Sequence, residues 1–192
     1  MEREIILTGL GGQGVQLAAK ILGEAANREG REVMMFGVFM GMIRGGSSES
    51  TVVVSDEEIV APPIIPKTWA VVGLHPAGLP ALQPKARPGG VLVANASLAA
   101  TLPEWPGIHR LLVPATDIAE RLGKPVGAAL VTLGAFAEAT GLVAVPSLID
   151  AMRHVLPPHR QQHVEGNIRC FEAGAAHVHE SGIGGDALRA WG

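Results

Sequence analysis

Four glycines fall within six residues near the start of the chain, where residues 9–14 read GLGGQG. This G-x-G-x-x-G spacing follows an apolar run and comes directly before a helical pattern of apolar residues. Glycine has no Cβ, so the main-chain N–H groups of such a turn can approach an anion, and the next helix N-terminus adds partial positive charge. The candidate ligand is a phosphate or pyrophosphate; the alternative is a turn that only packs the first helix closely on the sheet. The candidate binding residues are Gly9, Gly11, Gly12, Gln13 and Gly14.

The turn departs from two familiar phosphate-binding motifs. A dinucleotide-binding fold places an acidic residue at the end of its second strand, about 20 positions on, but this chain has VMMFG there. An ATP-binding P-loop needs Lys and then Ser or Thr after its last glycine, where Val15 and Gln16 stand. A stand-alone Rossmann-type protein that binds NAD(P) or another nucleotide remains an alternative, as does a coenzyme-binding regulatory module.

A second group of residues suited to an anion is Arg44, Gly45 and Gly46, followed by two serines. The planar guanidinium of an arginine suits phosphate or carboxylate, and the glycines let main chain come close to a ligand or a partner. Because loops that follow parallel strands meet at one sheet edge, we expect this segment to lie beside the glycine turn. An ordinary connecting loop with an exposed arginine explains the same residues equally well.

The sequence offers no convincing catalytic or metal-binding group. Cys170 is the only cysteine, so the chain cannot ligate an iron–sulfur cluster by itself, and its helical setting favours a buried small residue. His159 and His163 are four residues apart, and His177 and His179 are two apart, but a zinc site needs three or four ligands. We predict surface or interface roles for these histidines, no catalytic residue and no metal site.

Apolar runs and helical periodicities alternate along the first half of the chain, and helical patterns gather in the second half. They predict an α/β fold with a single three-layer domain over 1–180, a loose tail over 181–192, and a largely parallel sheet with helices on both faces. The predicted strands are residues 4–9, 32–37, 49–56, 69–74, 90–95 and 109–116. The predicted helices are residues 15–29, 117–123, 127–140, 146–156 and 161–180, with a short helix or proline-interrupted loop over 76–90.

Composition narrows the function classes. The chain has 192 residues, of which 47% are apolar and 17% charged, and its net charge is −3. No basic field attracts nucleic acid or an acidic membrane, and no run of about 18 apolar residues suggests a membrane span. The first residues lack the pattern of a signal peptide, so we expect a cytoplasmic protein.

Four segments in order carry a resemblance to a known family: GLGGQGVQLAAKILGEAA, RGGSSESTVVVSDEEI, VTLGAFAEATGLV and VEGNIRCFEAG. With them, nearly the whole chain resembles the gamma subunit, or gamma domain, of 2-oxoacid:ferredoxin oxidoreductases. Two positions depart from the family pattern. Met42 stands near the usual place of an acid, and Ala129 stands where many members have Asn.

The resemblance implies a function that this chain does not perform alone. Enzymes of the family decarboxylate a 2-oxoacid oxidatively and pass the electrons to ferredoxin and the acyl group to coenzyme A. Thiamine diphosphate, Mg and iron–sulfur clusters are implied on partner alpha, beta and ferredoxin-like delta subunits, and the isolated chain is implied to be inactive. The glycine turn would face the phosphates of a shared coenzyme A, and Arg44, Gly45 and Gly46 would border the active-site interface. A weakly charged, apolar chain is also expected to pair with itself or with a partner.

Overall fold

The computed structural model describes residues 1–39, 46–59, 65–99, 102, 104–182 and 188–191. A six-stranded sheet runs through its centre in the order β2-β3-β1-β4-β5-β6. The strands are β1 (Glu2–Leu10), β2 (Glu32–Phe39), β3 (Ser47–Ser55), β4 (Thr68–Gly73), β5 (Ala86–Asn95) and β6 (His109–Val113). All six predicted strands are present, and the prediction of an α/β fold with a largely parallel sheet is confirmed.

The sheet is mixed, because β3 runs opposite to the other five strands. Strands β1, β4, β5 and β6 are mutually parallel, whereas β3 is antiparallel to both β1 and β2. Seven residues separate the end of β2 at Phe39 from the start of β3 at Ser47, and a short connection can join antiparallel strands but not a parallel pair. Because β3 is antiparallel to both, β1 and β2 run in the same direction, and Gly9 and Phe39 near their carboxyl ends both pair with Ser48. The two strands therefore end at the same edge of the sheet, as expected.

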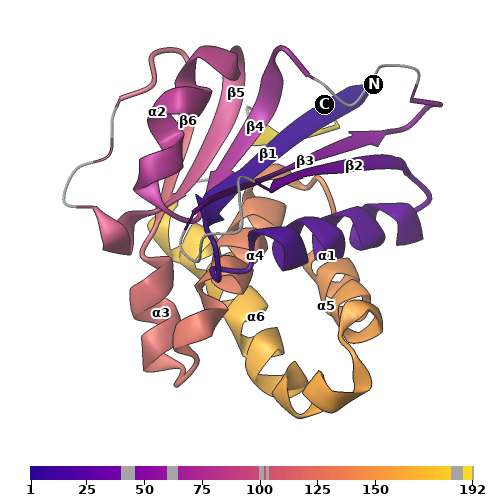
Figure 1. Cartoon of the computed structure of the whole chain (residues 1–192), viewed down its shortest axis with the longest axis vertical. Coiled ribbons are helices and arrows are strands. Elements are labelled where there is room, and N and C mark those ends of the chain that lie inside the picture. Colours follow the sequence, from indigo (N-terminus) through magenta and orange to yellow (C-terminus); the bar gives the residue numbers. More distant parts are fainter. Residues whose placement is uncertain (40–45, 60–64, 100–101, 103, 183–187, 192) are drawn as a thin grey trace.

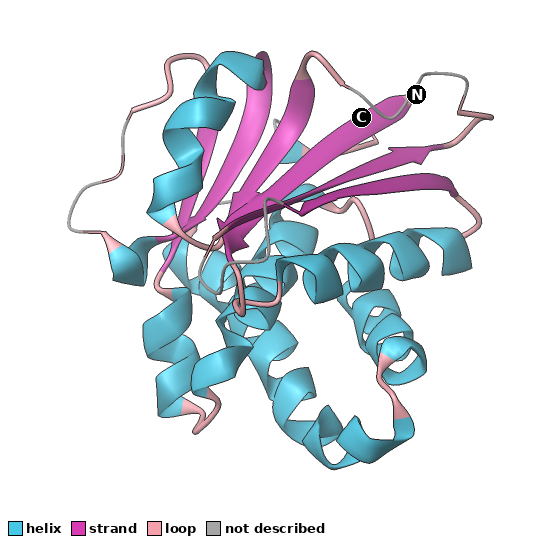
Figure 2. Cartoon of the chain, viewed as in Figure 1, coloured by secondary structure: helices cyan, strands magenta, loops and turns pink. Residues whose placement is uncertain are grey.

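Helices cover both faces of the sheet, as Figures 1 and 2 show. On one face lie α1 (Val15–Arg28), α4 (Ala128–Thr140), α5 (Val145–Val155) and α6 (Val164–Ser181), and α3 (Ala115–Arg121) packs beside α4. The short α2 (Leu79–Leu82) lies on the other face, between the 3₁₀ helices η1 (Pro76–Gly78) and η2 (Gln83–Lys85). The remaining 3₁₀ helices are η3 (Ala96–Leu98), η4 (Pro125–Gly127) and η5 (Pro158–His163).

Alternation along the strands divides the apolar side chains between the two faces. Ile5 and Leu7 of β1 belong to the larger core beneath α1 and α4, and Ile6 belongs to the smaller core beneath α2. Because both faces are covered, the three consecutive apolar residues are all buried. Within the described residues, no helix combines the length and the apolar character that a membrane span requires.

Two glycines allow α4 and α6 to pack almost backbone to backbone. A Cβ on Gly134 would clash with the main chain of Phe171, and a Cβ on Gly174 would clash with the main chain of Val131. Such close approach fixes how the N-terminal ends of the two helices lie relative to each other. Those ends form one wall of the candidate site.

The end of the chain is held more firmly than the sequence predicted. Residues 181–192 were expected to form a loose tail, but Ala190 is fully buried and its N–H donates to the carbonyl of Thr140 at 2.7 Å. The indole Nε1 of Trp191 donates to the carbonyl of Leu142 at 3.0 Å. The apolar and aromatic residues near the C-terminus therefore belong to the domain.

Candidate functional site

The glycine turn leads from β1 into α1 through two residues in left-handed conformations. Gly12 has φ 95° and Gly14 has φ 85°, a region that residues with a Cβ adopt only at a cost. Gly14 is the N-cap of α1, where no side chain caps the helix and no acidic residue lies in the first turn. The N–H groups at the start of α1 are therefore open to an external anion.

The other predicted residues of the turn hold the turn itself. Gly9 is buried in β1, where a Cβ would press against Gln13, Val15 and Leu74. The side-chain Oε1 of Gln13 turns back and accepts a hydrogen bond from the N–H of Leu10 at 2.8 Å. Close packing thus explains why residue 9 is a glycine. The hydrogen bond from Leu10 occupies the Oε1 atom of Gln13 within the turn.

The Arg-Gly-Gly segment meets the turn at one described residue. The N–H of Gly11 donates to the carbonyl of Gly46 at 2.8 Å, because β3 starts where antiparallel β1 ends and Leu10 pairs with Ser47. The two segments are neighbours, as predicted, and this bond uses the N–H of Gly11 within the protein. Arg44 and Gly45 lie outside the described residues.

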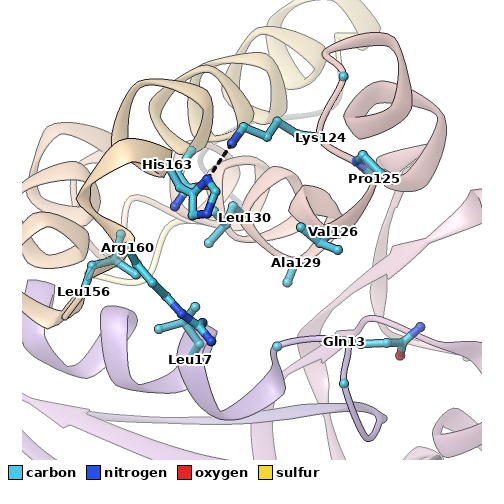
Figure 3. A pocket seen from close by; sticks show the side chains of 14 residues that line it. Gln13, Leu17, Lys124, Pro125, Val126, Ala129, Leu130, Leu156, Arg160 and His163 are labelled. Atoms are coloured by element: carbon cyan, nitrogen blue, oxygen red, sulfur yellow. Dashed lines mark hydrogen bonds between the residues drawn. The ribbon is translucent and has the colours of Figure 1, made fainter. Parts of the chain in front are cut away.

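A cleft of about 590 Å³ opens beside the turn. Gly12, Gln13, Gly14 and Leu17 form one side, and residues from the segments 123–130 and 156–167 form the other; we call this space the basic cleft (Figure 3). Its size is that of a small-molecule site. The N-terminal ends of α1, α4 and α6 all contribute to its lining, and each adds partial positive charge.

Three basic side chains lie on the wall opposite the glycine turn (Figure 3). Lys124 precedes η4, and Arg160 and His163 belong to η5, just before α6. The Nζ of Lys124 lies 3.4 Å from the Nδ1 of His163. An ammonium group has no lone pair, so it donates to Nδ1 and leaves the proton of the neutral ring on Nε2 as a further donor. Arg160 extends toward Leu17 on α1 (Figure 3).

Among the described residues that line the basic cleft, none is Asp or Glu. Within the same part of the chain, neither Lys124 nor Arg160 has a carboxylate partner. In a chain of net charge −3, this gathering of unneutralised positive charge around a concave surface favours a polyanionic ligand. The apolar side chains of Leu17, Ala129, Leu130 and Leu156 also line the cleft.

Sequence reasoning missed this basic wall. It weighed His163 as a zinc ligand, assigned it a surface or interface role instead, and did not single out Lys124 or Arg160. One signal was available, since basic residues stand just before the predicted helices over 127–140 and 161–180. A helix start next to Lys, Arg or His places side-chain cations beside the helix-dipole charge.

The other side chains considered from the sequence are the possible metal ligands and Cys170. Within the described residues, no group of three or more His, Cys, Asp and Glu side chains is arranged to hold a metal ion. Burial raises the pKa of the Cys170 thiol, and the positive charges of Lys124 and Arg169 offset part of that rise. Cys170 is fully buried, so its thiol is a packing group.

Comparison with known proteins gives one consistent family. Residues 4–177 match the family described as pyruvate ferredoxin/flavodoxin oxidoreductase. The 2-oxoglutarate synthase subunit KorC of Methanothermobacter marburgensis is 34% identical over 91% of this chain and 95% of its own length.

Two solved structures share the fold. The gamma subunit of a keto/oxoacid ferredoxin oxidoreductase from Geobacter sulfurreducens has a TM-score of 0.78 and 26% identity, covering 93% of this chain and 99% of its own. A 2-oxoglutarate:ferredoxin oxidoreductase from Magnetococcus marinus, solved with 2-oxoglutarate, coenzyme A and succinyl-CoA, has a TM-score of 0.83 and 20% identity. That match covers 93% of this chain and 31% of the longer one.

Proposed function

The chain belongs to the pyruvate ferredoxin/flavodoxin oxidoreductase family as a gamma-type subunit, and we propose that it binds the phosphates of coenzyme A in the basic cleft. The enzyme it serves oxidises a 2-oxoacid to the acyl-coenzyme A and passes the electrons to ferredoxin. The observation that carries the proposal is the open N-terminus of α1 at Gly12 and Gly14, which faces a wall with three basic side chains.

Partner subunits supply the reaction chemistry in this proposal. The chain has one cysteine, which is buried, and iron–sulfur clusters need several thiolates. The clusters, thiamine diphosphate and its Mg therefore belong to the alpha, beta and delta partners, and the isolated chain is inactive. In this proposal the complex lies in the cytoplasm, and the gamma chain positions coenzyme A within it.

The geometry supports coenzyme A over a nicotinamide dinucleotide. A Rossmann site needs a carboxylate at the end of a second strand that lies parallel and adjacent to the first. Here β3 separates β2 from β1, and β2 ends without a carboxylate. Coenzyme A instead needs sites for a diphosphate, an adenosine and a further phosphate. The basic cleft offers open N–H groups, an apolar floor and cationic side chains.

The test uses the enzyme assembled from this chain and its partner subunits. Gly12→Leu places a side chain where the anion would approach the turn, and a Cβ at Gly12 meets no other atom within 4 Å. We expect the KM for coenzyme A to rise about tenfold or more, corresponding to the loss of one charge-assisted contact. Reduction of the enzyme by 2-oxoacid without coenzyme A should change much less.

Gly30→Leu is the matched control. Gly30 also has a positive φ, 78°, and open space around its Cβ position, but it follows α1 and does not line the cleft. It therefore carries the same backbone strain without obstructing the anion. Equal KM values for coenzyme A in the two variants, or an equal loss of both half-reactions in Gly12→Leu, would refute the proposal.

A further inference from the structure

The basic cleft has two chemically different ends. At the glycine turn the donors are main-chain N–H groups at the start of α1, which carry only partial charge. At the opposite wall the donors are the ammonium of Lys124, the guanidinium of Arg160 and the imidazole of His163. Main-chain amides let a bridging diphosphate come close, whereas full side-chain charges suit a terminal phosphate with three free oxygens and up to two negative charges.

The wall is shaped around the position of its lysine. Gly166 lies in the first turn of α6, and a Cβ there would occupy the space of the Lys124 side chain, with Nζ at 2.8 Å. Lys124 is thus held half-buried against α6, within reach of His163. Arg160 is exposed and has no carboxylate partner in the described part of the chain, so its five N–H donors are free to close on a ligand.

Apolar groups also line the cleft. They are Leu17 of α1, Ala129 and Leu130 of α4, and Leu156 after α5. Such a surface suits a flat base and a sugar better than a further charge. The cleft therefore offers main-chain amides, cationic side chains and apolar surface together, which are the groups that a nucleotide with phosphates at two positions of its ribose requires.

We infer that Lys124 and Arg160, with His163, form a subsite for a terminal phosphomonoester, and that in coenzyme A this group is the 3′-phosphate of the adenosine. The inference rests on the proposed function, since that function supplies the ligand, but it assigns a separate role to the wall. The glycine turn holds the diphosphate, and the basic wall distinguishes coenzyme A from dephospho-coenzyme A. These residues therefore set specificity and take no part in acyl transfer.

Ligand truncation tests the assignment without relying on turnover. Calorimetry on the assembled enzyme gives the Kd of coenzyme A and of dephospho-coenzyme A, which lacks only the 3′-phosphate. We expect the native enzyme to prefer coenzyme A about tenfold or more, corresponding to one or two charge-assisted hydrogen bonds. Arg160→Met and Lys124→Met should each reduce that preference by weakening coenzyme A alone. Arg169→Met removes an exposed charge from α6 outside the lining and should leave the preference intact.

Each other outcome contradicts the inference. Equal Kd values for the two ligands in the native enzyme, or an undiminished preference in Arg160→Met and Lys124→Met, remove the 3′-phosphate from this wall. Weakening of both ligands by the same factor would place the cations on the diphosphate instead. Inorganic phosphate that displaces both ligands alike would show a general anion site.

The proposed function has its own readout in the same experiment. Gly12→Leu should weaken coenzyme A and dephospho-coenzyme A by the same factor, because the diphosphate is common to both. If it does so while Arg160→Met leaves the preference unchanged, the subsite is refuted and the proposed function stands. If Gly12→Leu affects neither ligand, the proposed function itself is refuted.

Discussion

The main-chain N–H of Gly11 donates to the carbonyl oxygen of Gly46 at 2.8 Å. This bond continues the antiparallel pairing of β1 with β3 by one step beyond Leu10 and Ser47. It therefore ties the glycine turn to the segment that leaves the β2–β3 connection. Since the N–H of Gly11 is occupied, an anion at this turn meets the amides further along, at Gly12, Gly14 and the first turn of α1.

The left-handed backbone at Gly14 predicts a specific order of stabilities. Gly14→Ala should lower the free energy of unfolding by about 1–2 kcal/mol, the cost of placing a residue with a Cβ in this conformation. Gly14→Asn should lose less, because Asn tolerates the left-handed region and is a favoured N-cap. Urea unfolding of the chain measures both values. An Ala variant as stable as the native chain would contradict the strain, since a Cβ at Gly14 meets only Ala129, at 3.7 Å.

The fold could be predicted from local pattern because burial on both faces leaves a clear signal. Ile5, Ile6 and Leu7 form a run without alternation, as a strand covered on both sides requires. The order of the strands could not be read from such runs. The relative direction of β2 and β3 could be predicted, because seven residues, 40–46, connect them and a parallel crossover needs a dozen or more residues.

Only the part of the candidate site that is continuous in sequence could be predicted. Gly12 and Gly14 could be predicted from their spacing, because the whole glycine motif lies in one turn. The basic wall combines Lys124 with Arg160, which are far apart in sequence and have no periodic relation. Only the close packing of α4 on α6, through Gly134 and Gly174, brings them to the same cleft.

Burial of the Cys170 thiol predicts slow chemical modification. Because the pKa of this thiol is raised by desolvation, the group stays protonated at pH 8, and the reactive thiolate is scarce. Iodoacetamide should therefore label the native chain slowly and the urea-unfolded chain rapidly. Cys170 is the only cysteine, so mass spectrometry of the isolated chain reads the rate directly. Equally fast labelling in both states would contradict the burial.

The same thiol links stability to alkaline pH. The folded chain keeps the Cys170 proton to a higher pH than the unfolded chain, so its contribution is complete below the unfolded pKa of the thiol. Stability should then decline as the pH rises through the raised folded pKa. Cys170→Ala should make the free energy of unfolding less dependent on pH in this range. An unchanged decline in that variant would assign the effect to other groups.

Trp191 anchors the end of the chain by two different interactions. Its Nε1 donates to the carbonyl of Leu142, and the guanidinium of Arg31 lies 3.9 Å from the centre of its ring. Trp191→Phe keeps an aromatic face but removes the donor, so it should cost about 1 kcal/mol. Trp191→Ala removes both interactions and should cost more. Thermal unfolding measures the loss of stability in each variant. Limited proteolysis should detach the C-terminal segment earlier in Trp191→Ala than in Trp191→Phe. Equal behaviour of both variants would contradict the stacking on Arg31.

Two glycines on α6 predict opposite consequences of the same substitution. At Gly174 a new Cβ meets the backbone of α4, including the N of Ala135 at 2.9 Å. Main chain cannot move aside without separating the helices, so Gly174→Ala should cost about 1–3 kcal/mol or more. At Gly166 the three atoms nearest to the new Cβ all belong to the flexible side chain of Lys124, which can rotate away. Gly166→Ala should therefore keep or increase stability, since Ala favours a helix by about 1 kcal/mol over Gly.

The Gly166 variant also separates the basic wall from the stability of the fold. Displacing Lys124 moves its ammonium from His163 and from the cleft, although no charge has been removed. We expect Gly166→Ala to unfold at the same urea concentration as the native chain or a higher one, and the assembled enzyme to bind coenzyme A more weakly. Its affinity for dephospho-coenzyme A should stay near the native value, because the lost contact is the one to the 3′-phosphate. Native affinity for coenzyme A in a stable Gly166→Ala variant would mean that the position of Lys124 is irrelevant to binding.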